Sequence, residues 1–154
     1  MPNLCLSNIS ELSDHVGESL GCSQWIEIDQ PRIDAFAEAT GDRQWIHVDT
    51  DRAKKESPFG DTIAHGYLTL AVIPSLLDEL IEVKGCSRIV NSGLDKLRLK
   101  EAVRSGSRIR INAQILNVRF FGGGDARVTF KVKWEIEGCE RPACLAEAVL
   151  IYFR

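Results

Sequence analysis

The sequence has no excess of positive charge and no long hydrophobic run, and each absence argues against a class of protein. Nineteen Lys and Arg against 22 Asp and Glu give a net charge of −3 and a pI near 5.6, so no nucleic-acid partner is expected. The longest apolar stretch, Tyr67 to Ile73, is too short to span a bilayer. The first twelve residues lack the basic and apolar regions of a signal peptide. No membrane association is therefore expected.

Paired cysteines are also missing. The five cysteines are odd in number and never form a C-x-x-C pair: Cys5, Cys22, Cys86, Cys139 and Cys144. This pattern indicates reduced thiols in a cytoplasmic protein rather than a disulfide framework or a zinc site. A length of 154 residues, 44% of them hydrophobic, predicts a single domain over residues 1–154. Residues 1–22 are weakly patterned and are expected to form an arm that is irregular or contains a short helical turn.

The first half of the chain predicts short elements around a polar loop. Residues 23–29 alternate as a strand does, and residues 32–40 repeat at helical spacing, with Pro31 before them and Gly41 after. A brief exposed helix is expected over 51–56 and a turn at 58–60. After Gly66, apolar residues run to Val83 on nearly every face. They predict one long buried helix, kinked at Pro74.

The second half predicts four long strands, over residues 88–99, 107–120, 127–136 and 143–153. In the second strand the alternation changes phase between Ile115 and Leu116, as a β-bulge would require. Gly122–Gly124 predicts a hairpin turn between the second and third strands. A buried helix and four antiparallel strands predict an α+β protein with a curved antiparallel sheet wrapped around the helix, which is the hot-dog fold.

Residues 41–69 hold two of the three histidines, and an acid, Asp42, lies five residues before the first of them, His47. A histidine exchanges protons near neutral pH, and a neighbouring carboxylate can carry a proton or orient the ring. The two groups together could hold one water and add it across an activated double bond, or reverse that reaction. Gly66 opens the predicted helix, where a free N–H could bind a carbonyl oxygen that gains negative charge.

Simpler interpretations exist for each of these residues. An Asp–His pair at this spacing is more often a loop salt bridge than a catalytic pair, and His65 is expected to cap the helix or to hydrogen-bond in the core. A metal site of His47, Asp49 and Asp51 has too few ligands to be favoured. Cys144 reads as a small core residue, and Gly122–Gly124 as a turn rather than a phosphate loop. Lys54, Lys55, Lys131 and Lys133 are most simply solvated.

Two stretches resemble a known family: Gly41-Asp42-x-Gln44-Trp45-Ile46-His47-x-Asp49, and Phe59-Gly60-x-Thr62-Ile63-Ala64-His65-Gly66-Tyr67-Leu68-Thr69. They resemble the MaoC-like dehydratases, in particular the (R)-specific enoyl-CoA hydratases and their nodulation-protein-N-like branch. Residues 90–98 and 142–148 extend the resemblance into the sheet. Many relatives have Asn-Pro before the loop histidine, where this chain has Gln44-Trp45-Ile46. Ser92 replaces an aromatic residue of many branch members, so acyl-chain length stays open.

The resemblance implies reversible syn hydration of a trans-2-enoyl-CoA thioester. Asp42 and His47 match the family's catalytic pair, and Gly66 matches the glycine whose N–H holds the thioester oxygen. It also implies a homodimer with sheets joined edge to edge, an acyl-CoA substrate and no cofactor or metal. A hot-dog thioesterase and a non-catalytic acyl-CoA-binding subunit are the alternatives, and coenzyme A or acyl-carrier protein could carry the substrate. Basic residues near the end of the first long strand could meet CoA phosphates or could simply be solvated: Lys96, Arg98, Lys100 and Arg104.

Overall fold

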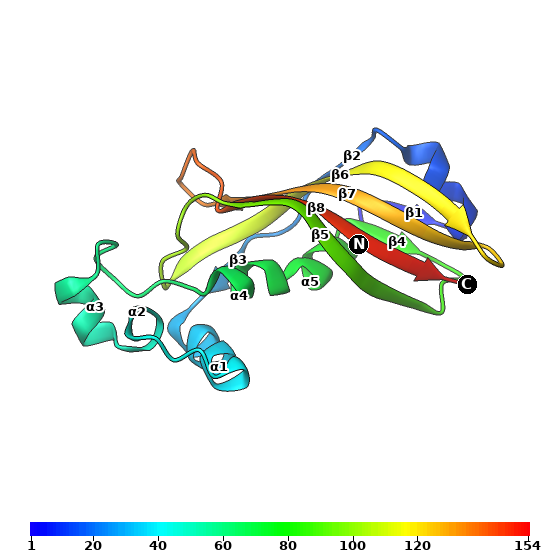
Figure 1. Ribbon diagram of the computed structural model, residues 1–154. Helices are drawn as coiled ribbons and strands as arrows, with labels where there is room; N and C mark the ends of the chain where they lie inside the picture. Colours follow the sequence, from blue (N-terminus) through cyan, green and yellow to red (C-terminus); the bar gives the residue numbers. More distant parts are fainter.

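The computed structural model describes all 154 residues and contains one main antiparallel sheet with helices on one side (Figure 1). The strand order is β2-β6-β7-β8-β5, and β3 pairs with β6 on the same side as β2. The bounds are β2 Ser19–Cys22, β3 Ile26–Ile28, β5 Arg88–Leu99, β6 Ser107–Phe121, β7 Asp125–Ile136 and β8 Cys144–Phe153. The four long strands predicted from the sequence are therefore confirmed.

Strands β6 and β7 show why the alternation was informative. Along β7, every second residue from Ala126 to Ile136 is buried, and those between them are not fully buried. The register between β6 and β7 shifts between Ile115 and Asn117, so the bulge predicted from the phase change is confirmed. The hairpin at Gly122–Gly124 joins the two strands as predicted.

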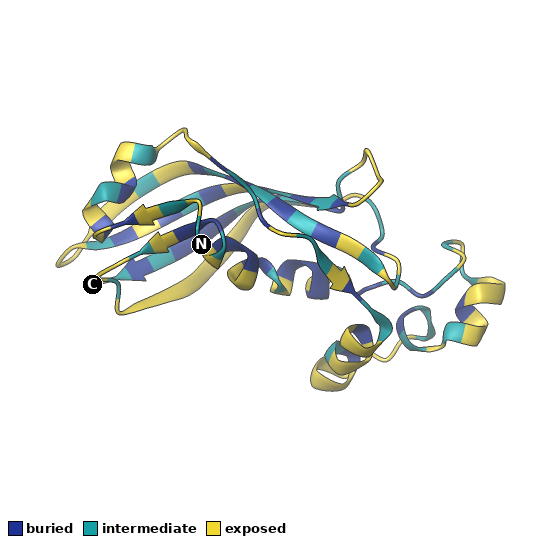
Figure 2. Cartoon of the chain, turned by 180° about the vertical axis from the view of Figure 1, so that it is seen from behind, coloured by how far each residue is buried: buried dark blue, intermediate teal, exposed yellow.

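The concave side of the sheet packs on two short helices, α4 (Gly66–Ala71) and α5 (Ile73–Asp78). The prediction of a single long helix buried on nearly every face is wrong. The helix is interrupted at Val72, and Pro74 lies in the first turn of α5, where a missing N–H costs nothing. Tyr67 is 77% exposed, and Ala71, Pro74 and Ser75 are also exposed. Figure 2 shows this alternation of buried and exposed residues along the helices.

The residues after α5 differ from the prediction as well. Ile81–Val83 form strand β4, which pairs in parallel with β1 (Leu4–Leu6). The hydrophobic run therefore continues into β4, although the helix ends at Asp78. Helical spacing and burial alone could not distinguish a buried helix from a buried strand in so short a segment.

The N-terminal arm is part of the fold, and it contains the short helical turn that was one of its two expected forms. After β1, residues Ile9–His15 form a 3-10 helix whose Leu12 is fully buried, and β2 then joins the main sheet. Leu6, Ile9 and Leu20 are also buried and belong to the same hydrophobic core as the sheet. The isolated leucines of this arm show no hydrophobic periodicity, because the 3-10 helix and the short strands contain too few residues to repeat a pattern.

Three helices extend from one end of the sheet (Figure 1): α1 (Gln30–Thr40), α2 (Trp45–Val48) and α3 (Thr50–Glu56). Helix α1 has Asp29 as its N-cap, and the Asp29 carboxylate accepts from the Arg32 N–H at 3.0 Å. It ends at Gly41, whose φ of 79° is left-handed and suits glycine. These helices hold the predicted Asp42–His47 loop beside the start of α4.

Candidate active site

Asp42 and His47 lie on a tight segment between α1 and α3. Asp42 directly follows the left-handed Gly41 that ends α1, and His47 lies on the single turn of α2. The amide of Gln30 ties this segment to the rest of the site, because it donates to the His47 carbonyl at 2.7 Å and accepts from the Thr62 hydroxyl at 2.6 Å. Sequence reasoning did not single out Gln30, since a helix-terminal glutamine carries no distinctive pattern.

His47 is buried, with 6% exposure, and its tautomer is fixed by a backbone carbonyl. Its Nδ1 lies 2.6 Å from the carbonyl oxygen of Ile63, and because a carbonyl can only accept, Nδ1 carries the proton. Nε2 of the neutral ring is then free to accept one. Burial lowers the pKa of His47 below 6.5, helped by the charge of His65 and opposed by the Ile63 hydrogen bond. This histidine is therefore suited to act as a base near neutral pH.

Asp42 is only partly buried and is held by Gln44. Its Oδ1 accepts from the Gln44 backbone N–H at 3.4 Å and from the Gln44 side chain at 3.2 Å. Desolvation raises the pKa of Asp42, but the Gln44 hydrogen bonds and the neighbouring histidines lower it more, so the net shift is downward. The carboxylate is therefore ionised at neutral pH and acts as an acceptor.

The structure brings together the two residues that the sequence paired. One carboxylate oxygen of Asp42 and one ring nitrogen each of His47 and His65 lie within 4.8 Å of one another. One water that bonds two groups at about 2.8 Å each spans up to about 5.6 Å, so a single water fits between Asp42 and His47. The loop salt bridge between Asp42 and His47 that was the simpler interpretation does not form, because the Asp42 carboxylate makes no ion pair with His47 or with any other basic residue.

Gly66 lies beside this pair, at the first position of α4. Its N–H makes no hydrogen bond within the protein, as expected for the first turn of a helix. An added Cβ would lie 2.8 Å from Cδ1 of Leu99. Because α4 has only six residues, its dipole is small, and the Gly66 N–H itself is the useful donor. A cavity of 270 Å³ adjoins it, lined largely by apolar side chains that include Phe59, Ile63, Leu99 and Val103.

His65 contacts both Asp42 and His47. It stands at the N-cap of α4 but makes no side-chain capping bond, so the capping interpretation is wrong and the core hydrogen bond is confirmed. Its Nε2–H donates to the Asp42 backbone carbonyl at 2.9 Å. Its ring stacks on His47, with centroids 3.8 Å apart and planes 24° apart, and also contacts Phe36. The His65 Nδ1 is buried without a partner.

Asp42, His47 and His65 are also the group of side chains close enough to be considered as metal ligands. Imidazole nitrogens bind a metal along lone pairs that lie in the ring plane. Because the two rings are stacked nearly parallel, their lone pairs do not converge on one ion. The other combination considered from sequence is also unsuitable, because the Asp49 carboxylate caps α3 by accepting from the Arg52 N–H at 3.0 Å.

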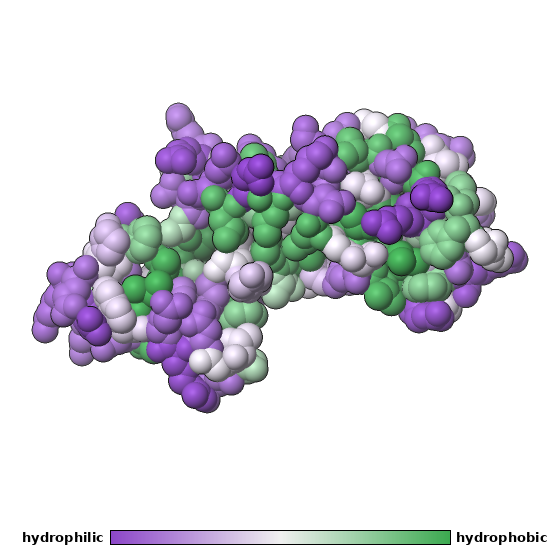
Figure 3. All heavy atoms as spheres, in the orientation of Figure 1, coloured by the Kyte–Doolittle hydropathy of each residue, from purple (hydrophilic) through white to green (hydrophobic).

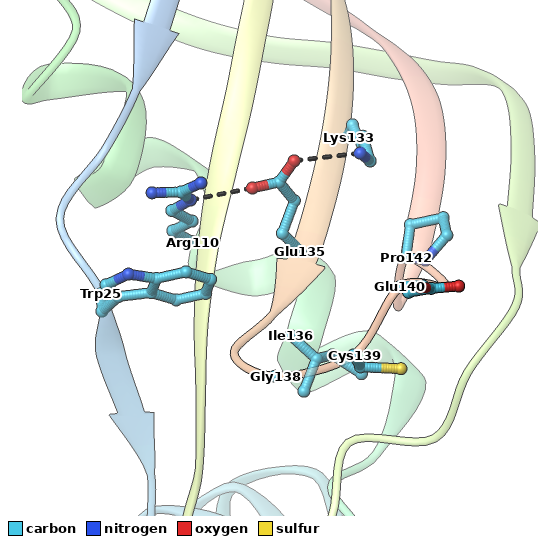
Figure 4. A pocket seen from close by; sticks show the side chains of 9 residues that line it. All are labelled: Trp25, Arg110, Lys133, Glu135, Ile136, Gly138, Cys139, Glu140 and Pro142. Carbon is cyan, nitrogen blue, oxygen red and sulfur yellow. Dashed lines mark hydrogen bonds and ion pairs between the residues drawn. The ribbon is translucent and has the colours of Figure 1, made fainter.

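The other polar features lie outside this site. A 340 Å³ cavity on the outer face of the sheet is shown in Figure 4. There, Arg110 and Lys133 both pair with Glu135, at 2.8 and 3.0 Å, and the Arg110 guanidinium lies over the Trp25 ring. Both cations are therefore paired with the same carboxylate. Cys144 is a buried core residue as predicted, and burial raises the pKa of its thiol to about 11, which makes it unreactive.

Comparison with known proteins gives the family. The model of the MaoC like domain matches residues 11–133. The 3-hydroxyacyl-thioester dehydratase Z of Mycobacterium tuberculosis is 42% identical over 145 residues, covering 94% of this chain and 95% of that one. Nodulation protein N of Rhizobium leguminosarum bv. viciae is 39% identical, covering 94% and 90%.

The fold agrees with these relatives. A crystal structure of a MaoC-like dehydratase from Rhodospirillum rubrum superposes with a TM-score of 0.70 at 23% identity, covering 90% of this chain and 92% of that one. None of the helices is both long enough and apolar enough to cross a membrane. The hot-dog fold predicted from the strand pattern is confirmed. The chain belongs to the MaoC-like domain family and is an enzyme of its hydratase and dehydratase class.

Proposed function

We propose that the protein catalyses reversible syn addition of water to a trans-2-enoyl-CoA, giving the (R)-3-hydroxyacyl-CoA. The observation that carries the proposal is the pair formed by the ionised Asp42 and the neutral, tautomer-fixed His47, at a separation that one water can bridge. Ile63 hydrogen-bonds to His47, and His65 hydrogen-bonds to Asp42. Gly66, which has a free N–H, directly follows these two residues in the same segment.

The mechanism uses each of these groups once. His47 Nε2 takes a proton from the water as the water oxygen bonds to C3, while Asp42 accepts the second hydrogen bond of that water and orients it. The electron pair of the double bond moves toward the thioester oxygen, where the Gly66 N–H stabilises the negative charge. The proton that His47 took from the water passes to the Asp42 carboxylate, which delivers it to C2 on the same face. The addition is therefore syn, and His47 and Asp42 return to their starting protonation states. The thioester acidifies C2, so no cofactor or metal is required.

The site offers room for the thioester beside Gly66. The 270 Å³ cavity is lined mainly by hydrophobic residues, as small-molecule sites usually are. We assign the acyl-thioester end of the substrate to this cavity, since Gly66 is one of the residues that line it. Lys100 also lines it and is the basic residue of the 96–104 group nearest to this cavity.

We further propose a homodimer that joins the sheets through β5. This strand is the longer of the edge strands of the main sheet, the other edge being formed by the short β2 and β3, and eleven of its twelve residues are exposed. Long exposed edges with apolar side chains readily pair with another chain, and Ile89, Val90 and Leu94 provide such side chains.

The five cysteines are all free, which supports a reducing, cytoplasmic location.

The acid–base pair is tested by conservative substitutions assayed with crotonyl-CoA. Asp42→Asn and His47→Gln remove the ionised carboxylate and the basic ring nitrogen with little change of shape. Each should lower kcat by about 10²–10⁴-fold, the range for general acid–base groups. His15→Gln is a matched control, because His15 lies far along the chain in the 3-10 helix and pairs with Glu18. Unchanged hydration in either site variant would overturn the assignment.

The two alternative functions differ in their products. A hydratase removes the enoyl absorbance without releasing thiol, whereas a thioesterase releases free CoA thiol from a saturated acyl-CoA. A non-catalytic binding subunit would bind acyl-CoA with no turnover of either kind. Parallel absorbance and thiol assays on the wild-type protein separate the three. The neutral His47 and the free Gly66 N–H favour the hydratase.

A further inference from the structure

Asp42 lies on a segment that has few connections to the rest of the protein. Hydrogen bonds made by residues 41–45 are almost all local. Gly41 bonds to Ala37, Asp42 to Thr40 and Gln44, and Arg43 to Glu38, all within five positions along the chain. Local bonds of this kind shape the loop but do not place it relative to α4.

The one hydrogen bond from this segment to a distant residue is made by His65. Its Nε2–H donates to the carbonyl oxygen of Asp42, 23 positions away in the chain. The same ring stacks on His47 at 3.8 Å, and the carbonyl of Ile63, two residues earlier, fixes the His47 tautomer. The segment 63–65 is itself anchored, because Ile63 N–H donates to Ile46 and Ala64 N–H donates to Val103.

Packing alone does not account for a histidine at this position. A buried polar atom without a partner destabilises the folded protein, and His65 Nδ1 is such an atom. A phenylalanine could make the same contacts with His47 and Phe36 without that cost. What phenylalanine lacks is the Nε2–H donor to Asp42, so the donor is the feature that distinguishes histidine here.

We propose that His65 is a positioning residue, whose Nε2–H holds the backbone of Asp42 while its ring supports His47, so that one side chain sets the separation of the acid–base pair. This inference rests on the proposed hydratase function for its kinetic test. It explains why the second half of the two-part motif contains a histidine that does not need to touch the substrate. A displacement of about 1 Å in such a pair can lower the rate about 10²-fold.

Two substitutions separate the donor from the ring. His65→Gln places an amide N–H near the position of Nε2 and loses the stacked ring, whereas His65→Phe keeps the ring and loses the donor. We expect His65→Phe to keep or raise the melting temperature and to lower kcat by about 10–10²-fold with little change in KM. We expect His65→Gln to lower the melting temperature and to retain more kcat than His65→Phe.

The opposite order of the two variants in stability and in kcat is the decisive result, because a purely structural role would make kcat follow stability. His15→Phe, the same change at the histidine outside the site, should leave kcat unchanged. Wild-type kcat in His65→Phe, or kcat that follows melting temperature in both variants, would overturn the inference and leave the hydratase proposal intact.

Failure of the proposed function would look different. If the wild-type enzyme hydrated no enoyl thioester, crystal structures of the two variants would decide the positioning role. A shift of the Asp42 backbone in His65→Phe but not in His65→Gln would support it, and an unmoved Asp42 in both would reject it.

Discussion

At the scale of residues, the two ring nitrogens of His47 have separate tasks. Nδ1 donates to the Ile63 carbonyl, which leaves Nε2 as the acceptor that a base requires. Burial favours the neutral ring and lowers its pKa below the ordinary value of 6.5. Both effects come from the fold around the residue and not from its position in the motif.

A pH profile of kcat/KM tests this environment. The base must be unprotonated, so activity should fall as the pH drops through the pKa of His47, and the lowered pKa places the midpoint of that acid limb below pH 6.5. The profile would be recorded from pH 4.5 to 8 with crotonyl-CoA. His15→Phe should give the same limb, whereas a wild-type midpoint above pH 6.5 would contradict the role of burial.

The Gly66 N–H can be tested with proline, whose ring carbon Cδ replaces the amide hydrogen. Proline suits the first position of a helix, and the preceding His65 has φ −58° and ψ 140°, the extended conformation that proline favours before it. Gly66→Pro should therefore fold. Gly66→Ala adds the same Cβ beside Leu99 and keeps the N–H, so it is the matched control.

The difference between these two variants isolates the donor. Loss of one hydrogen bond to a developing oxyanion typically lowers kcat about 10²–10³-fold, and we expect kcat of Gly66→Pro to be lower than that of Gly66→Ala by this factor. Equal kcat in the two would show that the N–H does not bind the thioester oxygen, whatever the absolute activities are.

At the scale of elements, the N-terminal 3-10 helix is a stabilising part of the core. Leu12 is fully buried in it. Leu12→Ala should destabilise the protein by about 2–5 kcal/mol, as large-to-small changes in cores do. Urea unfolding followed by circular dichroism measures the change. Val16→Ala, at a 45% exposed position just after the same helix, should change stability by less than about 0.5 kcal/mol; equal effects would show that the arm is not part of the cooperative core.

The elements differ in how far the sequence specifies them. Strands β6 and β7 could be predicted with their bulge because alternation is a local property, visible in a dozen residues. The burial of Leu12 and the pairing of β4 with β1 depend on contacts across 70 or more positions, which no local period records. The helix break at Val72 was missed for a related reason, since Pro74 is equally compatible with a kink and with a new first turn.

The site shows the same division. Asp42, His47 and Gly66 were found because acids, bases and glycines are recognisable in sequence. Gln30 and the donor role of His65 were missed because they depend on bonds to backbone carbonyls 17 and 23 positions away. A backbone carbonyl is present at every residue, so sequence gives no signal for its use.

At the scale of the whole molecule, the free edge of the sheet determines how chains can assemble. In Figure 3 apolar surface gathers along the middle of one face, between polar ends, and β5 carries exposed Val90 and Leu94. Val90→Lys with Leu94→Lys should convert a dimer to a monomer, because facing lysines repel and oppose edge pairing. Light scattering coupled to size-exclusion chromatography measures the mass.

Val16→Lys is the matched control, since Val16 has the same exposure as Val90 within about one percentage point but lies outside the main sheet. It should leave the mass unchanged. A wild-type monomer at micromolar concentration, or an unchanged dimer in the β5 variant, would exclude assembly through this edge.

The three tryptophans divide the molecule into separate optical environments. Trp134 is fully buried in β7, and Trp25 lies on the outer face beside Arg110, both away from the Asp42–His47 pair. Trp45 is half-buried two residues before His47, with the Arg52 guanidinium 4.3 Å over its ring. A cation over an indole and a nearby binding event both change its emission. With Trp25 and Trp134 replaced by phenylalanine, the fluorescence of Trp45 would report occupation of the site directly, in a protein whose chemistry is otherwise followed only through its substrate.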